Sequence, residues 1–401
     1  MYPILHNGDI VYYKALPYEQ IRLNDIIVAR VSDHYTTHRV IHKDTTYLIT
    51  KGDNLRNIDP PISPNHIVGV VYKVKREKTE FHPDTYYLLQ SSIYYDHINK
   101  LVKELDKKNL SYVLLKGLPL HLKYKREHPR RKFFDFDILI RHKDRAAVLK
   151  KLGALGFSKR VDFMSSTHEK LMDKPIEETY MKKLDGFAIS VDVHYEAVFM
   201  MTQIGTLNEL YHQKHIDNFT KELFEHTVYY QSQTLSCRLL QDEYLLVYLA
   251  LHFFHHNYKG MHRLELIQQI ITSIPKKMKS RFWLRVFDIV SRFSMDGYIY
   301  GTFLSLNNHF PETKIPETFL DKIKPPLSKR NYLKKYFRQE QIYDDSGSIR
   351  TGVQLFKNLY MLSYNPWYIR IRVFFRPAVI YMSLWIVYYK VSSILAVQKK
   401  S

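Results

Sequence analysis

Short apolar runs separated by turn residues occupy the first 76 positions of the chain. The runs are rich in valine and isoleucine, and they lie at 9–13, 25–31, 38–41, 47–50 and 67–72. Turn signals such as Asn7-Gly8 and Asp59-Pro60 stand between them. Closely spaced runs of this kind are typical of strands in a small all-β domain. We therefore expect a β domain over residues 1–76, followed by a charged linker over residues 77–85.

Beyond this linker the pattern alternates between helical and strand-like segments. Apolar residues three or four positions apart predict a helix from Ile93 to Lys107. Further helices are predicted at 118–124 and 144–155, the second ended by Gly156, and strands at 112–115, 135–140 and 189–194. This alternation predicts a small α/β core over residues 86–205. The chain as a whole is thus predicted to be a multi-domain α+β protein.

The remainder of the chain has a mostly helical pattern. We expect a helical extension over residues 206–310, with clear helices at 242–254 and 262–274, and a C-terminal helical region over 311–401. Within that region, Arg376 and Lys390 bracket about a dozen apolar residues, fewer than the roughly 20 that span a bilayer. The segment 374–397 is therefore predicted to be a buried final helix, with an interfacial membrane helix as the alternative.

Composition changes this picture little. The formal charge is +20, from 60 Lys and Arg against 40 Asp and Glu, which is compatible with an anionic partner. A compositional bias toward Lys and toward the 32 tyrosines explains it equally well. The single cysteine, Cys237, excludes an internal disulfide and a cysteine-based zinc site. No apolar leader opens the sequence, so we expect a cytoplasmic location, with peripheral membrane contact as an added possibility.

The candidate chemistry lies in three aspartates of the predicted α/β core. Asp135 and Asp137 stand at positions i and i+2 of a strand, so their side chains project from one face, roughly 7 Å apart at the backbone. Asp192 stands between two valines of another strand, and Lys116-Gly117 follows a third. Carboxylates that share divalent cations, beside a glycine turn open to phosphate, suit phosphoryl transfer. An Asp-x-Asp pair alone is often a solvated strand edge, but this combination favours function.

These residues resemble the signature of the nucleotidyltransferase superfamily: a glycine turn, an Asp-x-Asp strand and a third acid on an adjacent strand. More narrowly, residues 86–310 resemble an uncharacterised nucleotidyltransferase family. Its Lys-Gly start corresponds to Lys116-Gly117, its Arg and Asp-x-Asp motif to Arg131–Leu139, and its acid-apolar-His-aromatic motif to Asp192–Tyr195. Leu118 departs from the wider superfamily, which usually has Gly or Ser there.

The resemblance implies a polymerase-beta-like core and a set of roles. Asp135 and Asp137 would hold two Mg²⁺ ions, and Asp192 would share one of them and help to activate the acceptor. Lys116, Gly117 and Arg131 would contact the nucleotide phosphates. The implied reaction transfers a nucleoside monophosphate from a nucleoside triphosphate to a hydroxyl of an unknown peptide, sugar or metabolite. Three histidines at helical spacing, His252, His255 and His256, could suggest a metal cluster, but no acid is spaced to join them, which favours a structural role.

The first 76 residues resemble the signal peptidase I superfamily of β-rich serine proteases. The matching pieces run in order from Asn7-Gly8-Asp9 through His38-Arg39-Val40 and Lys51-Gly52-Asp53 to Ile67-Val68-Gly69. The resemblance makes His38 the base of a peptidase whose nucleophilic serine would precede Met1. Because the sequence begins at Met1, we expect a degenerate domain, with a vestigial base, that could bind a peptide. The alternatives are a non-catalytic peptide-binding scaffold, or a serine protease whose true start lies upstream.

Overall fold

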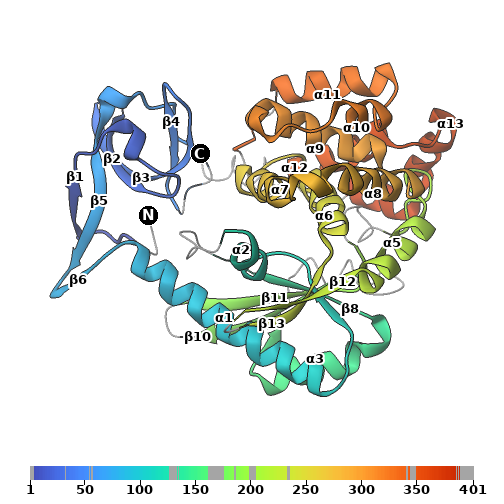
Figure 1. Ribbon diagram of the computed structural model, residues 1–401, viewed down its shortest axis with the longest axis horizontal. Coiled ribbons are helices and arrows are strands. Elements are labelled where there is room, and N and C mark those ends of the chain that lie inside the picture. The colour runs from blue at the N-terminus through green and yellow to red at the C-terminus, as the bar shows by residue number, and fades with distance from the viewer. Residues whose placement is uncertain are drawn as a thin grey trace.

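The computed structural model describes residues 4–31, 33–53, 55, 57–125, 133, 135–160, 176–184, 187–197, 205–232, 235–339, 342–343, 349–384, 386 and 388. It contains two β-sheets and a large set of helices (Figure 1). The first sheet lies apart from the second and is joined to it through the long helix α1 (Asp84–Lys107). The molecule is therefore of the mixed α and β kind that the sequence predicts.

The N-terminal sheet is antiparallel, with strand order β1-β5-β2-β3-β4 and with β6 added beside β5. Its strands are β1 (Ile10–Lys14), β2 (Ile26–Val31), β3 (His34–Lys43), β4 (Leu48–Lys51), β5 (Ile67–Arg76) and β6 (Thr79–Phe81). Two small groups of buried hydrophobic side chains cover its two faces, and one of them includes Tyr87 of α1. The predicted strands of residues 1–76 are thus present. The expected linker, residues 77–85, instead contains β6 and the first two residues of α1.

The second sheet has the order β12-β13-β7-β8-β11-β10-β9. Its strands are β7 (Tyr112–Leu114), β8 (Phe136–Ile140), β9 (Ser158–Lys159), β10 (Glu177–Leu184), β11 (Phe187–His194), β12 (Thr227–Gln231) and β13 (Ser236–Leu240). The pairs β13–β7 and β8–β11 are parallel, and the other pairs are antiparallel. All residues of β8 are buried because helices cover both faces. α1 and α3 (Arg145–Ala154) lie below the sheet in Figure 1, and α2 (Leu118–Lys125) and α6 (Asp242–His255) lie above it.

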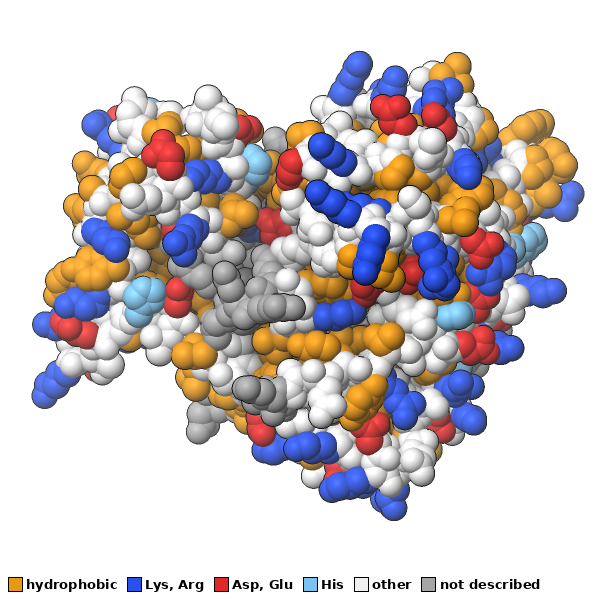
Figure 2. Space-filling model, in the orientation of Figure 1, with side chains coloured by type: hydrophobic (Ala, Val, Ile, Leu, Met, Phe, Trp, Pro, Cys, Tyr) orange, Lys and Arg blue, Asp and Glu red, His pale blue; other side chains and the backbone are white. Residues whose placement is uncertain are grey.

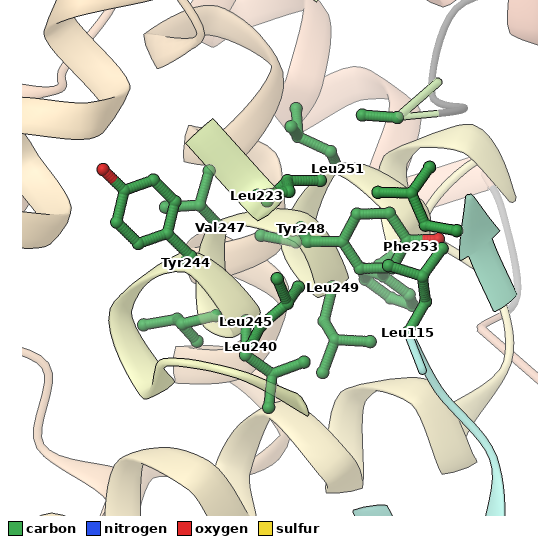
Figure 3. Packing of buried hydrophobic residues seen from close by; sticks show 14 of the residues in the cluster. Leu115, Leu223, Leu240, Tyr244, Leu245, Val247, Tyr248, Leu249, Leu251 and Phe253 are labelled. Carbon is green, nitrogen blue, oxygen red and sulfur yellow. The ribbon is translucent and has the colours of Figure 1, made fainter. Parts of the chain in front are cut away.

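The helical part is built around α6, whose residues Tyr244–Phe254 are all buried. A helix that is apolar on every side must be enclosed, and α6 contacts the helices α7, α8 and α9 as well as the sheet. Figure 3 shows Leu240 of β13 and Leu115 after β7 beside Tyr248 and Leu249 of α6. One hydrophobic core therefore runs from the second sheet into the helices.

The remaining helices continue from this core to the C-terminal region. They are α5 (Gln213–Glu225), α7 (Met261–Ser273), α8 (Lys279–Arg292), α9 (Asp296–His309), α10 (Glu317–Lys322), α11 (Leu327–Gln339), α12 (Ile349–Leu362), α13 (Trp367–Arg370) and the 3₁₀ turn η7 (Ile371–Phe375). Among the described residues, no helix combines the length and the apolar character needed to cross a bilayer.

Two expectations about the later chain need correction. The range 206–310, expected to be a helical extension, also contributes β12 and β13 to the sheet. The segment 374–397, expected to be a buried helix, is helical over residues 377–384, but its side chains are only partly covered. Val379 is buried, whereas Leu384 is 65% exposed. A short apolar run can form either a strand or a helix, and it can be buried or exposed. The apolar pattern of the sequence alone therefore could not predict β12, β13 or the exposure of residues 377–384.

Candidate active site

The three predicted aspartates meet at one place on the second sheet. Strands β8 and β11 are parallel neighbours, and their register sets Asp192 directly beside Asp137. Asp135 precedes Asp137 by two positions, which puts both side chains on the same face. One carboxylate oxygen from each of the three residues lies within 4.8 Å of the others. Asp137 is buried and the other two are partly buried, so the group faces a restricted space.

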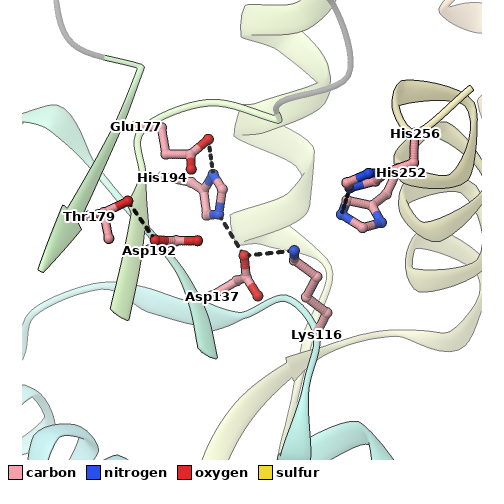
Figure 4. Close-up of polar contacts among 8 residues, drawn as sticks. All are labelled: Lys116, Asp137, Glu177, Thr179, Asp192, His194, His252 and His256. Carbon is pink, nitrogen blue, oxygen red and sulfur yellow. Dashed lines mark hydrogen bonds and ion pairs between the residues drawn. The ribbon is translucent and has the colours of Figure 1, made fainter. Parts of the chain in front are cut away.

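Asp137 is the centre of the polar network drawn in Figure 4. Its Oδ1 lies 2.9 Å from Nε2 of His194 and 3.0 Å from Nζ of Lys116. Its Oδ2 is buried and has no hydrogen-bond partner among the described residues. Burying a carboxylate oxygen without a hydrogen-bond partner destabilises the folded protein. A buried oxygen of this kind therefore needs an explanation, such as binding to an ion. The unpaired Oδ2 of Asp137 is therefore well suited to bind a cation.

Two residues of strand β10 contact Asp192 and His194. Thr179, paired with Asp192 in the β10–β11 ladder, donates a hydrogen bond of 2.7 Å from its Oγ1 to Oδ1 of Asp192. Glu177 places Oε2 3.6 Å from Nδ1 of His194. His194 is thus held between Asp137 and Glu177. We infer that the imidazole orients Asp137, and that Thr179 orients Asp192.

The electrostatics of the three carboxylates differ. Burial and the charge of Asp137 raise the pKa of Asp135 above its ordinary value. Burial, again with Asp137, raises the pKa of Asp192 to about 7. Burial alone would raise the pKa of Asp137, but the contacts with Lys116 and His194 outweigh burial and lower this pKa. Three acids this close cannot all ionise without additional positive charge.

These residues fit a divalent cation such as Mg²⁺. Carboxylate oxygens are the hard ligands that Mg²⁺ prefers, and it is commonly held by one or two carboxylates together with substrate phosphates. The triad offers an oxygen from each of three acids, one of them with an unpaired buried atom. Within the described part of the chain, it is the one group of three or more potential ligands of this kind.

The turn at Lys116-Gly117 lies against the triad. Gly117 has φ +88°, a conformation that suits glycine, and a Cβ there would stand 3.6 Å from the carbonyl oxygen of Asp135. Leu118 begins α2 with its side chain 2% exposed in the hydrophobic core, which accounts physically for an apolar residue at this position. Arg131, the third predicted phosphate contact, lies outside the described residues.

His252 of α6 and His256, which directly follows this helix, lie on the far side of Lys116 in Figure 4. Nε2 of His252 and Nε2 of His256 lie 3.2 Å apart, within hydrogen-bond reach. Burial is the main cause that lowers the pKa of both rings, and the charges of Lys116 and Arg263 add to it. Two neutral imidazoles that share one hydrogen bond agree with the predicted structural role.

The predicted peptidase base lies in the N-terminal sheet. Nδ1 of His38 is 2.6 Å from Oδ2 of Asp59, and the Thr50 hydroxyl donates to the same oxygen at 2.5 Å. Burial raises the pKa of Asp59, but His38 and Thr50 outweigh it and lower the value. The geometry is that of an oriented imidazole, and its role stays a prediction.

Sequence reasoning missed Glu177 and Thr179 because it did not predict strand β10. A usable signal was present: Asp185-Gly186 separates two β-prone runs, and an Asp-Gly pair is a strong hairpin signal. In the structure Leu184 and Phe187, the residues on either side of Asp185-Gly186 in the sequence, are paired in the β10–β11 ladder. The hairpin would have placed Thr179 opposite Asp192.

Comparison with known proteins identifies the family of this chain. The sequence profile of a family described as "Uncharacterised nucleotidyltransferase" matches residues 87–300, which is more than half of the chain. A crystal structure of an antigenic nucleotidyltransferase-like protein from Paracoccidioides brasiliensis is similar over 58% of this chain and 94% of that one, with 14% identity and a TM-score of 0.36. No curated protein matches the sequence. The matched profile covers the glycine turn, all three aspartates and α6, and on this basis the chain belongs to the uncharacterised nucleotidyltransferase family.

Proposed function

We propose that the protein is a metal-dependent nucleotidyltransferase that moves a nucleoside monophosphate from a nucleoside triphosphate to a hydroxyl acceptor. The observation that carries this proposal is the convergence of Asp135, Asp137 and Asp192, with the buried Oδ2 of Asp137 unpaired. Membership of the family supplies the reaction class. The acceptor is proposed only as a hydroxyl of a peptide, sugar or small metabolite.

Asp135, Asp137 and Asp192 would hold the cations, proposed to be two Mg²⁺ ions. Bound Mg²⁺ would neutralise phosphate charge and lower the pKa of the attacking hydroxyl. Asp192 would share one of these ions and help to activate the acceptor by taking the proton of its hydroxyl. The oxygen of the acceptor forms a bond to the α-phosphorus, the bond from that phosphorus to the bridging oxygen breaks, and pyrophosphate leaves.

Lys116, Gly117 and Arg131 are the proposed phosphate contacts. The Lys116 ammonium already lies beside Asp137, and the Gly117 turn stands next to the backbone of Asp135. An incoming phosphate would meet a positive charge and backbone amides there. His194 would act through Asp137 by fixing its orientation, which makes it a positioning residue.

Calorimetry with each nucleoside triphosphate, with and without Mg²⁺, tests the proposal. We expect one nucleotide to bind in a Mg²⁺-dependent way, and the double variant Asp135→Asn, Asp137→Asn to abolish that binding. The matched control is Asp288→Asn, Asp321→Asn, which removes two exposed carboxylates of α8 and α10. Failure of folded wild-type protein to bind any nucleotide would reject the transferase and favour a non-catalytic scaffold.

For the N-terminal sheet we propose a signal-peptidase-like, degenerate domain that binds a peptide. The supporting observation is the His38–Asp59 contact with its Thr50 hydrogen bond. We expect residues 1–401 to hydrolyse no peptide and to resist a serine-directed fluorophosphonate probe. A longer gene product that the probe labels at a serine just before Met1 would instead favour the protease alternative.

A further inference from the structure

A surface of exposed apolar side chains runs along the C-terminal region. Nine of the 23 large hydrophobic side chains that are exposed among the described residues fall within residues 367–388. We call these nine the aromatic edge: Trp367, Tyr368, Ile371, Phe374, Phe375, Ile380, Tyr381, Leu384 and Tyr388. In Figure 1 α13 projects at the right-hand margin of the molecule, and Figure 2 shows hydrophobic side chains beside basic ones there. Large apolar side chains that are exposed together in one short segment point to an interaction site.

The backbone beneath the aromatic edge is firmly held, so its exposure is not the result of a loose tail. Val373 is fully buried, and Asn365 donates hydrogen bonds to the carbonyl oxygens of Asn208 and Glu209. Arg376 is paired with Glu209 at 2.8 Å. The segment therefore buries one side against the helices and presents a second apolar side outward.

The charge of this region has one sign. After Asp345 the sequence contains no acidic residue, whereas it contains eight Lys and Arg, three of which lie within the aromatic edge: Arg370, Arg372 and Arg376. Arg372 is exposed. Exposed Trp, Tyr and Phe next to basic residues are typical of segments that lie in the headgroup layer of a membrane and attract anionic lipid.

We propose that the aromatic edge docks the protein on the surface of an anionic lipid membrane. Trp367 and Phe375, 66% and 76% exposed, enter the boundary between headgroups and acyl chains. Arg372 meets the lipid phosphates. Arg376 is paired with Glu209, but Arg370 and Arg372 leave an excess of positive charge along residues 367–388. This excess favours an anionic membrane over a second copy of the chain, because two copies meeting edge to edge would bring like charges together.

Sedimentation with lipid vesicles tests the proposal on the full-length chain. We expect binding to vesicles of phosphatidylcholine and phosphatidylserine to be at least about tenfold tighter than to phosphatidylcholine alone, and to weaken with salt. The variant Trp367→Ser, Phe375→Ser should bind at least about tenfold more weakly, since each side chain buries a large apolar area in the membrane. The matched control is Leu284→Ser, Leu327→Ser, which removes side chains that are 60% and 61% exposed elsewhere.

Thermal unfolding followed by circular dichroism checks that both double variants fold like the wild type. Equal binding to the two vesicle types, or equal binding by Trp367→Ser, Phe375→Ser and the wild type, would overturn the proposal. So would a wild-type dimer that ignores vesicles and becomes monomeric in that variant, because the aromatic edge would then be the contact between two copies.

Discussion

Replacing Lys116 by methionine probes the charge balance of the aspartate triad. Nζ of Lys116 lies 3.0 Å from Oδ1 of Asp137, whose side chain is 1% exposed. Removing one partner of a buried ion pair costs about 3–5 kcal/mol, because the remaining charge is left uncompensated. The Lys116 side chain itself is 21% exposed, so we expect the lower end, about 3 kcal/mol, when Mg²⁺ is removed with a chelator.

Saturating Mg²⁺ should reduce this deficit. A ligand that binds only the folded state at a hundred times its Kd adds about 2.7 kcal/mol to the free energy of unfolding. In the variant the cation also replaces the lost positive charge beside Asp137. The difference between Lys116→Met and wild type should therefore shrink by at least about 1 kcal/mol in Mg²⁺.

Urea unfolding in chelator and in Mg²⁺ measures both values. The matched control is Lys151→Met, because Lys151 is 26% exposed and pairs with Glu104 at 2.7 Å, outside the triad. We expect the control to lose less than about 1 kcal/mol and to be indifferent to Mg²⁺. The reasoning is refuted if Lys116→Met is as stable as wild type in chelator, or if its deficit is the same in both conditions.

Three further predictions concern the residues around the triad. Thr179→Val removes the hydrogen bond to Asp192, so it should weaken Mg²⁺ binding severalfold in calorimetry, whereas Thr179→Ser should bind Mg²⁺ like the wild type. Equal Mg²⁺ affinities of the two variants would contradict this. Gly117→Ala should lower the free energy of unfolding by about 1–2 kcal/mol, because φ is +88° at this position. A variant as stable as the wild type in urea unfolding would contradict this. For Glu178, burial raises the pKa, but hydrogen bonds led by that from Arg145 outweigh it and lower the value from 4.5 to about 2. The ionised Glu178 therefore stabilises the fold above pH 4.5, and this contribution, about 2–3 kcal/mol, is lost as the pH falls toward 2. Glu178→Gln should remove this pH dependence of the free energy of urea unfolding. The same pH dependence in the variant and the wild type would contradict the account.

The sequence predicted those parts of the site that depend on residues close together along the chain. The spacing of Asp135 and Asp137 sets their common face within a single strand, and the glycine turn follows directly from Lys116-Gly117. Asp192 could be named as a third acid because valines flank it. That β11 lies parallel to β8 with Asp192 beside Asp137 is a long-range pairing, however, which the family resemblance supplied and residue patterns did not.

The contacts that orient the acids were not predictable in the same way. Thr179 and Glu177 act from β10, a strand whose pattern Glu-Glu-Thr-Tyr carries no clean alternation. A single residue separates the end of strand β13 at Leu240 from the start of α6 at Asp242. A short apolar run this close to a helix is easily taken for part of the helix. The exposed side of residues 367–388 was hidden for the opposite reason: apolar residues favour burial, and only the packed structure shows which remain outside.

The central claim is that the triad holds the cations that bind the nucleotide. Electron paramagnetic resonance with Mn²⁺ in place of Mg²⁺ tests it most directly, by counting the bound ions with and without a non-hydrolysable nucleoside triphosphate. We predict that wild-type protein binds Mn²⁺ and acquires a second ion with the nucleotide, and that Asp137→Asn loses this binding while remaining folded. Mn²⁺ binding that is absent in the wild type, or unchanged in Asp137→Asn, would contradict the account.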